Sequence, residues 1–186
     1  MRLERIHVVG TSGVGKTTLA RRLAQRLGIP HVELDALYWG PDWTPMPGFR
    51  ERVAEALRGE AWTVDGNYRV VRDIIWDRAD TVVWLDYALP VILFRVTWRT
   101  VRRALRREEL WNGNRERFRE AFLSGESIIW WALSTYRRRK REYPRLFQQP
   151  KYAHLTIVSL PSPRAARRWL DALPRPPIYQ FTSYQP

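Results

Sequence analysis

Eight residues near the amino terminus have the types and the spacing needed to bind phosphate. The segment from Gly10 to Thr17 reads GTSGVGKT and fits the pattern G-x-x-x-x-G-K-[ST]. A mostly apolar run at 6–9 precedes it and a helical pattern follows, so main-chain N–H groups and the positive end of a helix would face one point. We predict a loop that holds a nucleoside triphosphate, with Lys16 on the β- and γ-phosphates and the Thr17 hydroxyl on Mg²⁺. The predicted nucleotide contacts in this loop are Gly10, Ser12, Gly13, Val14, Gly15, Lys16, Thr17 and Thr18.

Two aspartates stand where predicted strands end. Asp65 follows the predicted strand 61–64 and is placed like a carboxylate that orients Mg²⁺, although it could instead open the turn that it forms with Gly66. Asp35 follows the predicted strand 31–34 and could accept the proton of an attacking hydroxyl, or it could cap the turn that comes after it. We favour the metal role for Asp65 and the catalytic role for Asp35.

The net charge of +13 comes largely from arginine and is concentrated in two segments. Arg95 and Arg99 stand one helical turn apart and so project from the same face of a helix. We expect them to close over the transferring phosphates as part of a lid, together with Arg102 and Arg103. The second segment, 137–141, reads RRRKR, and we interpret it as a solvated or substrate-facing helix in preference to a nucleic-acid surface.

Length and composition predict a single α/β domain. A chain of 186 residues can bury a substantial core, and the absence of cysteine excludes disulfides and thiolate metal sites. Alternating strand and helix patterns predict a parallel sheet covered on both faces, with ligands at the carboxyl ends of its strands. The expected strands are 5–9, 31–34, 61–64, 81–85 and 154–159, and the expected helices are 16–27, 49–58, 70–76, 90–107, 117–123, 128–141 and 164–173.

The linkers and aromatic residues predict an acceptor side and a lid. The proline-rich loop 40–48 is expected to cover an acceptor pocket, with Trp39 and Trp43 as candidate walls and the other tryptophans mostly in the core. Residues 109–115 resemble the tip of a lid. His7 and His154 are expected to pack or to form hydrogen bonds, because the three scattered histidines make no metal cluster.

These motifs together resemble the adenylate kinase-related superfamily of small P-loop kinases. The resemblance covers about residues 1–173 and is carried by the loop 10–17, by the segment DGNYR at 65–69 and by the segment from Leu85 to Arg99. Residues 31–39 and 62–68 resemble a bacterial branch labelled adenylate kinase-like or DNA topology modulation proteins. The resemblance implies a three-layer P-loop fold with a five-stranded parallel sheet, a lid at about 100–127, acceptor-side helices at about 35–60 and a tail at 174–186.

The resemblance also implies roles for residues outside the phosphate loop. Arg69 matches the arginine that grips the acceptor phosphate in adenylate kinases, Arg95 the one that stacks on the donor adenine, and Arg99 the one that reaches the transferring phosphates. The loop containing Ser162 and Pro163 matches the segment that wraps around the donor base. The candidate acceptor-binding residues are Asp35, Trp39, Asn67, Tyr68, Arg69, Arg72 and Arg103.

Two departures from adenylate kinases direct the choice of acceptor. Adenylate kinases continue Asp-Gly with Phe-Pro-Arg, whereas Asn67 and Tyr68 stand here. Shikimate, gluconate and chloramphenicol kinases, whose acceptors are hydroxyls, carry an aspartate at about the place of Asp35. We therefore expect Mg²⁺-dependent transfer of the γ-phosphoryl group of ATP, with GTP left open, to a small hydroxyl-bearing acceptor.

Two alternatives remain, a nucleoside monophosphate kinase and a P-loop protein that regulates by binding nucleic acid. The sequence shows no export signal or membrane anchor, so we expect a cytoplasmic protein, either a monomer or a homodimer.

Overall fold

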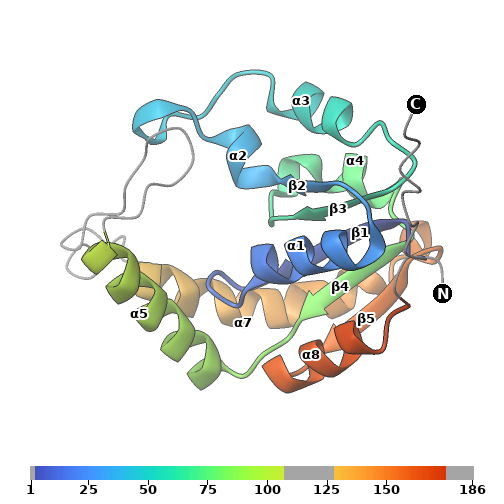
Figure 1. Cartoon of the computed structure of the whole chain (residues 1–186). Helices are drawn as coiled ribbons and strands as arrows, with labels where there is room; N and C mark the ends of the chain where they lie inside the picture. The colour runs from blue at the N-terminus through green and yellow to red at the C-terminus, as the bar shows by residue number, and fades with distance from the viewer. Residues whose placement is uncertain (1–2, 107–127, 175–186) are drawn as a thin grey trace, which may run out of the picture.

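A five-stranded parallel sheet forms the middle layer of the protein (Figure 1). The computed structural model describes residues 3–106 and 128–174. The strands lie in the order β2-β3-β1-β4-β5. Their bounds are Arg5–Gly10 for β1, His31–Glu33 for β2, Trp62–Asp65 for β3, Thr81–Leu85 for β4 and Thr156–Leu160 for β5. All five expected strands are present, and the predicted fold class is confirmed.

The register of the strands gathers polar groups at one edge of the sheet. In β3, Asp65 pairs with Val8 of β1 on one side and with Glu33 of β2 on the other. Gly10, the last residue of β1, pairs with Leu85 of β4. Because all of these strands are parallel, their carboxyl ends open onto the same edge, where the phosphate loop begins.

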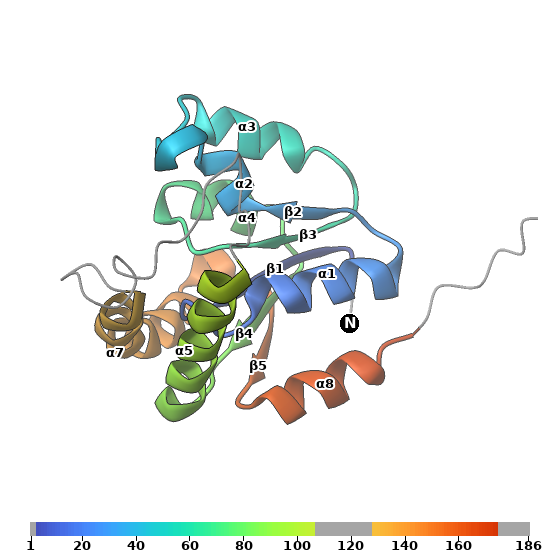
Figure 2. The same ribbon diagram turned by 60° about the vertical axis from the view of Figure 1, so that its left-hand side comes forward.

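Helices cover both faces of the sheet (Figures 1 and 2). One core packs alternate β1 residues such as Ile6 and Val8 against α1, α5 and α8, and the second packs Val9 against α3, α4 and α7. The bounds are Lys16–Leu27 for α1, Phe49–Ala56 for α3, Arg72–Trp76 for α4, Leu89–Arg106 for α5, Ile128–Phe147 for α7 and Pro163–Asp171 for α8. Shorter elements are α2 at Leu34–Tyr38, η1 at Pro41–Trp43, η2 at Arg69–Val71 and η4 at Pro150–Tyr152.

Several bounds differ from the sequence prediction: the expected helix 70–76 is divided into η2 and α4, the expected helix 49–58 ends at Ala56, and the expected strand 154–159 lies at Thr156–Leu160. Two further differences concern α2 and α7. Leu34 begins the short helix α2, where the pattern predicted the end of a strand. Helix α7 does not stop at 141 but continues through Pro144 to Phe147. The extension is stabilised by packing, because the rings of Tyr143 and Phe147 stack with centroids 5.7 Å apart and Tyr143 is buried in the second core. The expected helix 117–123, the predicted lid tip and the tail lie outside the described residues.

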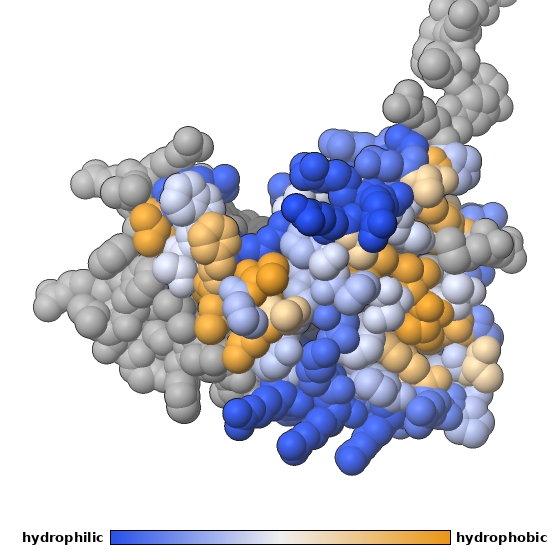
Figure 3. Space-filling model, turned by 90° about the horizontal axis from the view of Figure 1, so that it is seen from below, coloured by the Kyte–Doolittle hydropathy of each residue, from blue (hydrophilic) through white to orange (hydrophobic). Residues whose placement is uncertain are grey.

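One side of helix α5 is buried in the first core, and another side exposes large apolar residues to solvent. Ile92 and Val96 are buried in the first core, whereas Phe94 and Trp98 are 71% and 63% exposed. Trp98 is therefore an exception to the expectation that the tryptophans pack inside, which Trp62 and Trp76 meet. Figure 3 shows orange apolar areas beside blue hydrophilic side chains on the face seen from below.

Within the described parts of the chain, no helix combines the length and the apolar character that crossing a bilayer requires.

A buried histidine of β1 links α4 to the segment that follows β3. The ring of His7 accepts a hydrogen bond at Nδ1 from Trp76 Nε1 (2.8 Å) and donates one from Nε2 to the main-chain oxygen of Gly66 (2.9 Å). Because the indole N–H can only donate, the ring is held in its neutral form. Burial lowers the pKa of His7 from 6.5 to about 4.

The depressed pKa of His7 predicts a loss of stability in mild acid. The unfolded chain takes up a proton on His7 below pH 6.5, whereas the folded protein resists protonation down to about pH 4. The contribution of His7 to the free energy of unfolding is therefore fully present above pH 6.5. It falls by on the order of 3 kcal/mol as the pH drops toward 4. Urea unfolding of wild type and of His7→Gln across this range should show a steeper decline in wild type. Parallel declines would contradict this assignment.

Candidate active site

The phosphate loop is held in shape by glycines at positions where a side chain does not fit. Gly13 has φ +75°, and a Cβ there would lie 2.0 Å from a methyl carbon of Val96. Gly15 has φ +101° and immediately precedes the first residue of α1. The left-handed backbone at these positions turns the chain from β1 into α1, so that Lys16 and Thr17 occupy the first helical turn.

The two predicted metal-binding side chains meet beside this loop. The Thr17 hydroxyl donates to Oδ2 of Asp65 at 2.7 Å, and Asp65 is 3% exposed. The other carboxylate oxygen, Oδ1, accepts from Nε2 of His31 at 2.8 Å. A hydroxyl and a carboxylate are the oxygen donors that Mg²⁺ prefers, so this pair fits the predicted ion. His31, which the sequence analysis did not single out, fixes the orientation of the carboxylate from the neighbouring strand.

Lys16 is half-buried, with two arginines and two aspartates near enough to affect its charge. Its Nζ atom donates to the main-chain oxygen of Thr11 at 3.4 Å. Burial, and then the positive charge of Arg139, lower the pKa of Lys16 from 10.5 to about 8; Arg99 acts in the same direction, and Asp65 and Asp35 oppose the shift. The negative charge of a bound anion would also oppose the shift and favour the protonated amine.

Arg139 comes from the basic segment that the sequence analysis interpreted as solvated or substrate-facing. Its four neighbours in 137–141 are exposed, but Arg139 is 6% exposed and donates to the main-chain oxygen of Gly10 at 3.3 Å. Thr135, Arg139 and Tyr143 are all buried, four residues apart along α7. That helical spacing is the signal by which sequence reasoning could have separated Arg139 from its neighbours.

Asn67 ties the start of the phosphate loop to the rest of the molecule. Its Nδ2 donates to the main-chain oxygen of Gly10 at 2.7 Å, and its Oδ1 accepts from the main-chain N–H of the same glycine at 3.3 Å. The hydroxyl of Tyr143 also donates to Oδ1, at 2.9 Å. The sequence analysis named Asn67 as a residue that contacts the phosphoryl acceptor. In the structure its hydrogen bonds hold the start of the phosphate loop in position.

Asp35 lies on α2 within an aromatic cluster. The hydroxyl of Tyr68 donates to Oδ1 of Asp35 at 2.6 Å, and the Tyr68 ring contacts Tyr38 and Phe49. Burial, and then the charge of Asp35, raise the pKa of Tyr68, which keeps its hydroxyl a donor. Trp39 packs edge-on against Tyr38, with ring centroids 4.7 Å apart. Asp35 is close enough to Lys16 for its charge to raise the pKa of the lysine, so the predicted base lies within electrostatic reach of the phosphate loop.

The remaining predicted residues divide among three places. Arg95 donates to the main-chain oxygen of Val14 in the phosphate loop at 2.6 Å and lies 5.6 Å from the centre of the Tyr87 ring. Ser162 caps α8, its Oγ accepting from the N–H of Ala165. Arg69 and Arg72 turn instead toward Glu142 of α7. The side chain of Arg103 lies outside the described part.

The Asn67 bridge predicts a sharp effect of a shape-conserving substitution. Asn67→Asp removes the donor to the oxygen of Gly10 and places a carboxylate beside it. We expect a loss of about 1–3 kcal/mol of unfolding free energy, measured by urea denaturation. Gln148→Glu makes the same chemical change at an exposed position and should have little effect. Equal stability of the two variants would show that the bridge is not needed.

Comparisons with known proteins identify the family and the fold of the chain. A family model described as "AAA domain" matches residues 6–176. A shikimate kinase of Synechococcus elongatus is 28% identical over 141 residues, covering 63% of this chain and 74% of that protein. The uncharacterized protein YqaC of Bacillus subtilis is 30% identical over 127 residues, covering 66% and 71%. The solved shikimate kinase of Acinetobacter baumannii, in complex with shikimate, has a TM-score of 0.54 and 22% identity, covering 91% of this chain and 89% of that one.

The family match spans most of the chain and contains the phosphate loop, both aspartates and all of the sheet except Arg5, the first residue of β1. The chain therefore belongs to this AAA-domain family, among the small ATP-dependent P-loop kinases.

Proposed function

We propose that this kinase transfers the γ-phosphoryl group of ATP to a hydroxyl of a small molecule, with Mg²⁺ as cofactor. The observation that carries the proposal is the position of Asp35, which accepts a hydrogen bond from Tyr68 and lies within electrostatic reach of Lys16. An acceptor that is already a phosphate needs no base at neutral pH, whereas a hydroxyl must lose its proton as it attacks. The shikimate kinase relatives have an acceptor of that chemical class.

Each side chain of the site has a task in this reaction. The amides of the phosphate loop and Lys16 hold the triphosphate, and Arg95 and Arg99 neutralise charge on the transferring group. Thr17 and Asp65 would hold Mg²⁺, which supplies further positive charge to the phosphates when bound. Asp35 accepts the proton of the acceptor hydroxyl, and Tyr68 keeps the carboxylate oriented with one oxygen available.

The aromatic side of the site gives the acceptor a wall. Tyr38, Trp39 and Trp43 follow one another in edge-to-face contacts beside Asp35, and Trp43 is 36% exposed. Such rings pack against the apolar face of a cyclic or sugar-like compound while its hydroxyls meet polar groups. We propose an acceptor of that kind, bound on the α2 side of the sheet edge.

The proposed base is tested with Asp35→Asn. Wild type, incubated with Mg·ATP and a panel containing shikimate, gluconate and mononucleotides, identifies the accepted compound by its phosphorylated product. With that compound, Asp35→Asn should lower kcat by at least about 100-fold and leave ATP affinity nearly unchanged, because only proton transfer is lost.

Two variants act as controls for this experiment. Tyr68→Phe keeps the carboxylate and removes its orienting bond, so its loss of kcat should be smaller. Asp42→Asn changes an exposed aspartate and should behave as wild type. Formation of nucleoside diphosphates from mononucleotides, undiminished in Asp35→Asn, would instead assign the protein as a nucleoside monophosphate kinase.

The lowered pKa of Lys16 predicts that nucleotide binding depends on pH. Above about pH 8 the free protein has lost the proton of Lys16, and a bound triphosphate restores it. ATP affinity should therefore fall by up to about tenfold per pH unit above pH 8, with proton uptake visible by calorimetry in buffers of different ionisation enthalpy. Lys16→Arg should abolish this dependence, since guanidinium keeps its charge. If wild type bound ATP equally well at all pH values above 8, the proposed contact of Lys16 with the triphosphate would be contradicted.

A further inference from the structure

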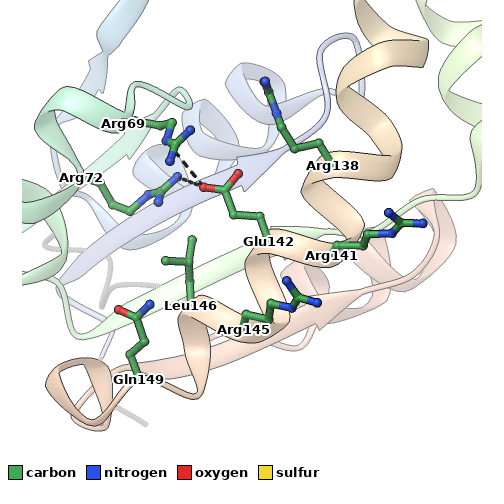
Figure 4. Close-up of a pocket in the computed structure, with 8 residues that line it drawn as sticks. All are labelled: Arg69, Arg72, Arg138, Arg141, Glu142, Arg145, Leu146 and Gln149. Carbon is green, nitrogen blue, oxygen red and sulfur yellow. Dashed lines mark hydrogen bonds and ion pairs between the residues drawn. The ribbon is translucent and has the colours of Figure 1, made fainter.

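A second concentration of positive charge lies between α4 and the carboxyl-terminal half of α7 (Figure 4). A hollow of about 600 Å³ opens there. We call it the arginine pocket. Its charged lining consists of Arg69, Arg72, Arg138, Arg141, Arg145 and Glu142.

The arginine pocket uses a different face of α7 from the active site. Arg138, Arg141, Glu142 and Arg145 follow the helical spacing of three and four residues, so they share one face of the helix. The buried face, which includes Arg139, points instead at Gly10 and the phosphate loop. One helix therefore serves two separate positive sites.

The charges of the arginine pocket do not balance. Glu142 accepts from Arg72 at 3.0 Å and lies 3.8 Å from Nε of Arg69. Within residues 3–106 and 128–174, Arg138, Arg141 and Arg145 form no ion pair with a carboxylate. Among the described residues, five arginines and one carboxylate thus line a shared hollow, an arrangement that an incoming anion would stabilise.

One arginine of the pocket is held in place before any ligand arrives. The side chain of Arg72 is 16% exposed, and its guanidinium lies 5.5 Å from the centre of the Trp76 ring. Trp76 is in turn fixed by its hydrogen bond to His7 and by stacking on Phe147. A guanidinium carries five N–H donors, and the described residues occupy one of those of Arg72. The cost of ordering this group for a ligand has therefore already been met by the fold.

We propose that the arginine pocket binds a small phosphorylated molecule, distinct from the nucleotide held by the phosphate loop. Guanidinium groups match phosphate through paired hydrogen bonds as well as charge. All five arginines line one hollow of small-molecule size. In Figure 4, Arg69 and Arg72 turn toward Glu142, whereas Arg138, Arg141 and Arg145 extend from α7 in different directions. A nucleic acid would instead need a track of positive charge for its successive phosphates. The proposal does not depend on which acceptor the kinase phosphorylates.

The test uses inorganic tripolyphosphate as the probe. The full-length protein is first saturated with Mg²⁺ and a non-hydrolysable ATP analogue, so that the phosphate loop is filled, and tripolyphosphate is then titrated by calorimetry. We expect wild type to bind it and Arg138→Gln/Arg145→Gln to bind it at least about tenfold more weakly, because two charged donors are lost. Folding of each variant is checked by its thermal transition and by its affinity for the ATP analogue.

A matched control removes the same charge elsewhere. Arg164→Gln/Arg167→Gln on α8 also deletes two exposed arginines, but on the other face of the sheet, and should bind as wild type does. No binding by wild type, or equal weakening in the two double variants, overturns the proposal. Duplex DNA binding that is tighter than tripolyphosphate binding and is lost in Arg138→Gln/Arg145→Gln would overturn the assignment to a small molecule. Failure to bind the ATP analogue would count against the proposed function alone.

Discussion

Positive charge held out of water at the carboxyl edge of the sheet is the constraint on which the site depends. Lys16 lies half-buried beside the buried Arg139, and the loss of solvation and that neighbouring charge both weaken its hold on a proton. Asp65 and Asp35 offset the charge only in part. A polyphosphate supplies what is missing, so the free energy needed to bury these cations is recovered when nucleotide binds. Full solvation of these cations would weaken their attraction for the polyphosphate.

The fold holds this charge by anchoring the backbone around it. The main-chain oxygen of Gly10 accepts from both Asn67 and Arg139, and Asn67 is itself held by Tyr143. These contacts join β1, the segment after β3, and α7 at one point. The phosphate loop therefore starts from a fixed position, and its glycines need only turn the chain into α1. Arg139 contributes to both features, because it donates to the main-chain oxygen of Gly10 and adds positive charge near Lys16.

The parts of this arrangement that are local in sequence could be predicted, and the parts that depend on distant contacts could not. The phosphate loop is contiguous, and strands such as β1 and β4 show β-branched runs, so their places followed from the pattern. The meeting of Thr17 with Asp65 followed from the parallel order of strand ends. By contrast, the role of Asn67 requires knowing that Gly10, 57 residues away, lies beside it. His31 likewise acts across two strands, and no local pattern marks it.

Helix α7 shows why composition alone could not separate the members of the basic segment. Arg138 and Arg139 are neighbours in sequence, but about 100° of helical rotation separates them, so one enters the arginine pocket and the other reaches the phosphate loop. The continuation of the helix through Pro144 brings Arg145 onto the same face as Arg138. The buried face is fixed by Tyr143 and Phe147, which pack against the aromatic core beside Trp76 and Trp84. The apolar residues of this helix thus decide which of its cations are buried at the nucleotide site and which face the second hollow, and the distribution of charge follows from packing.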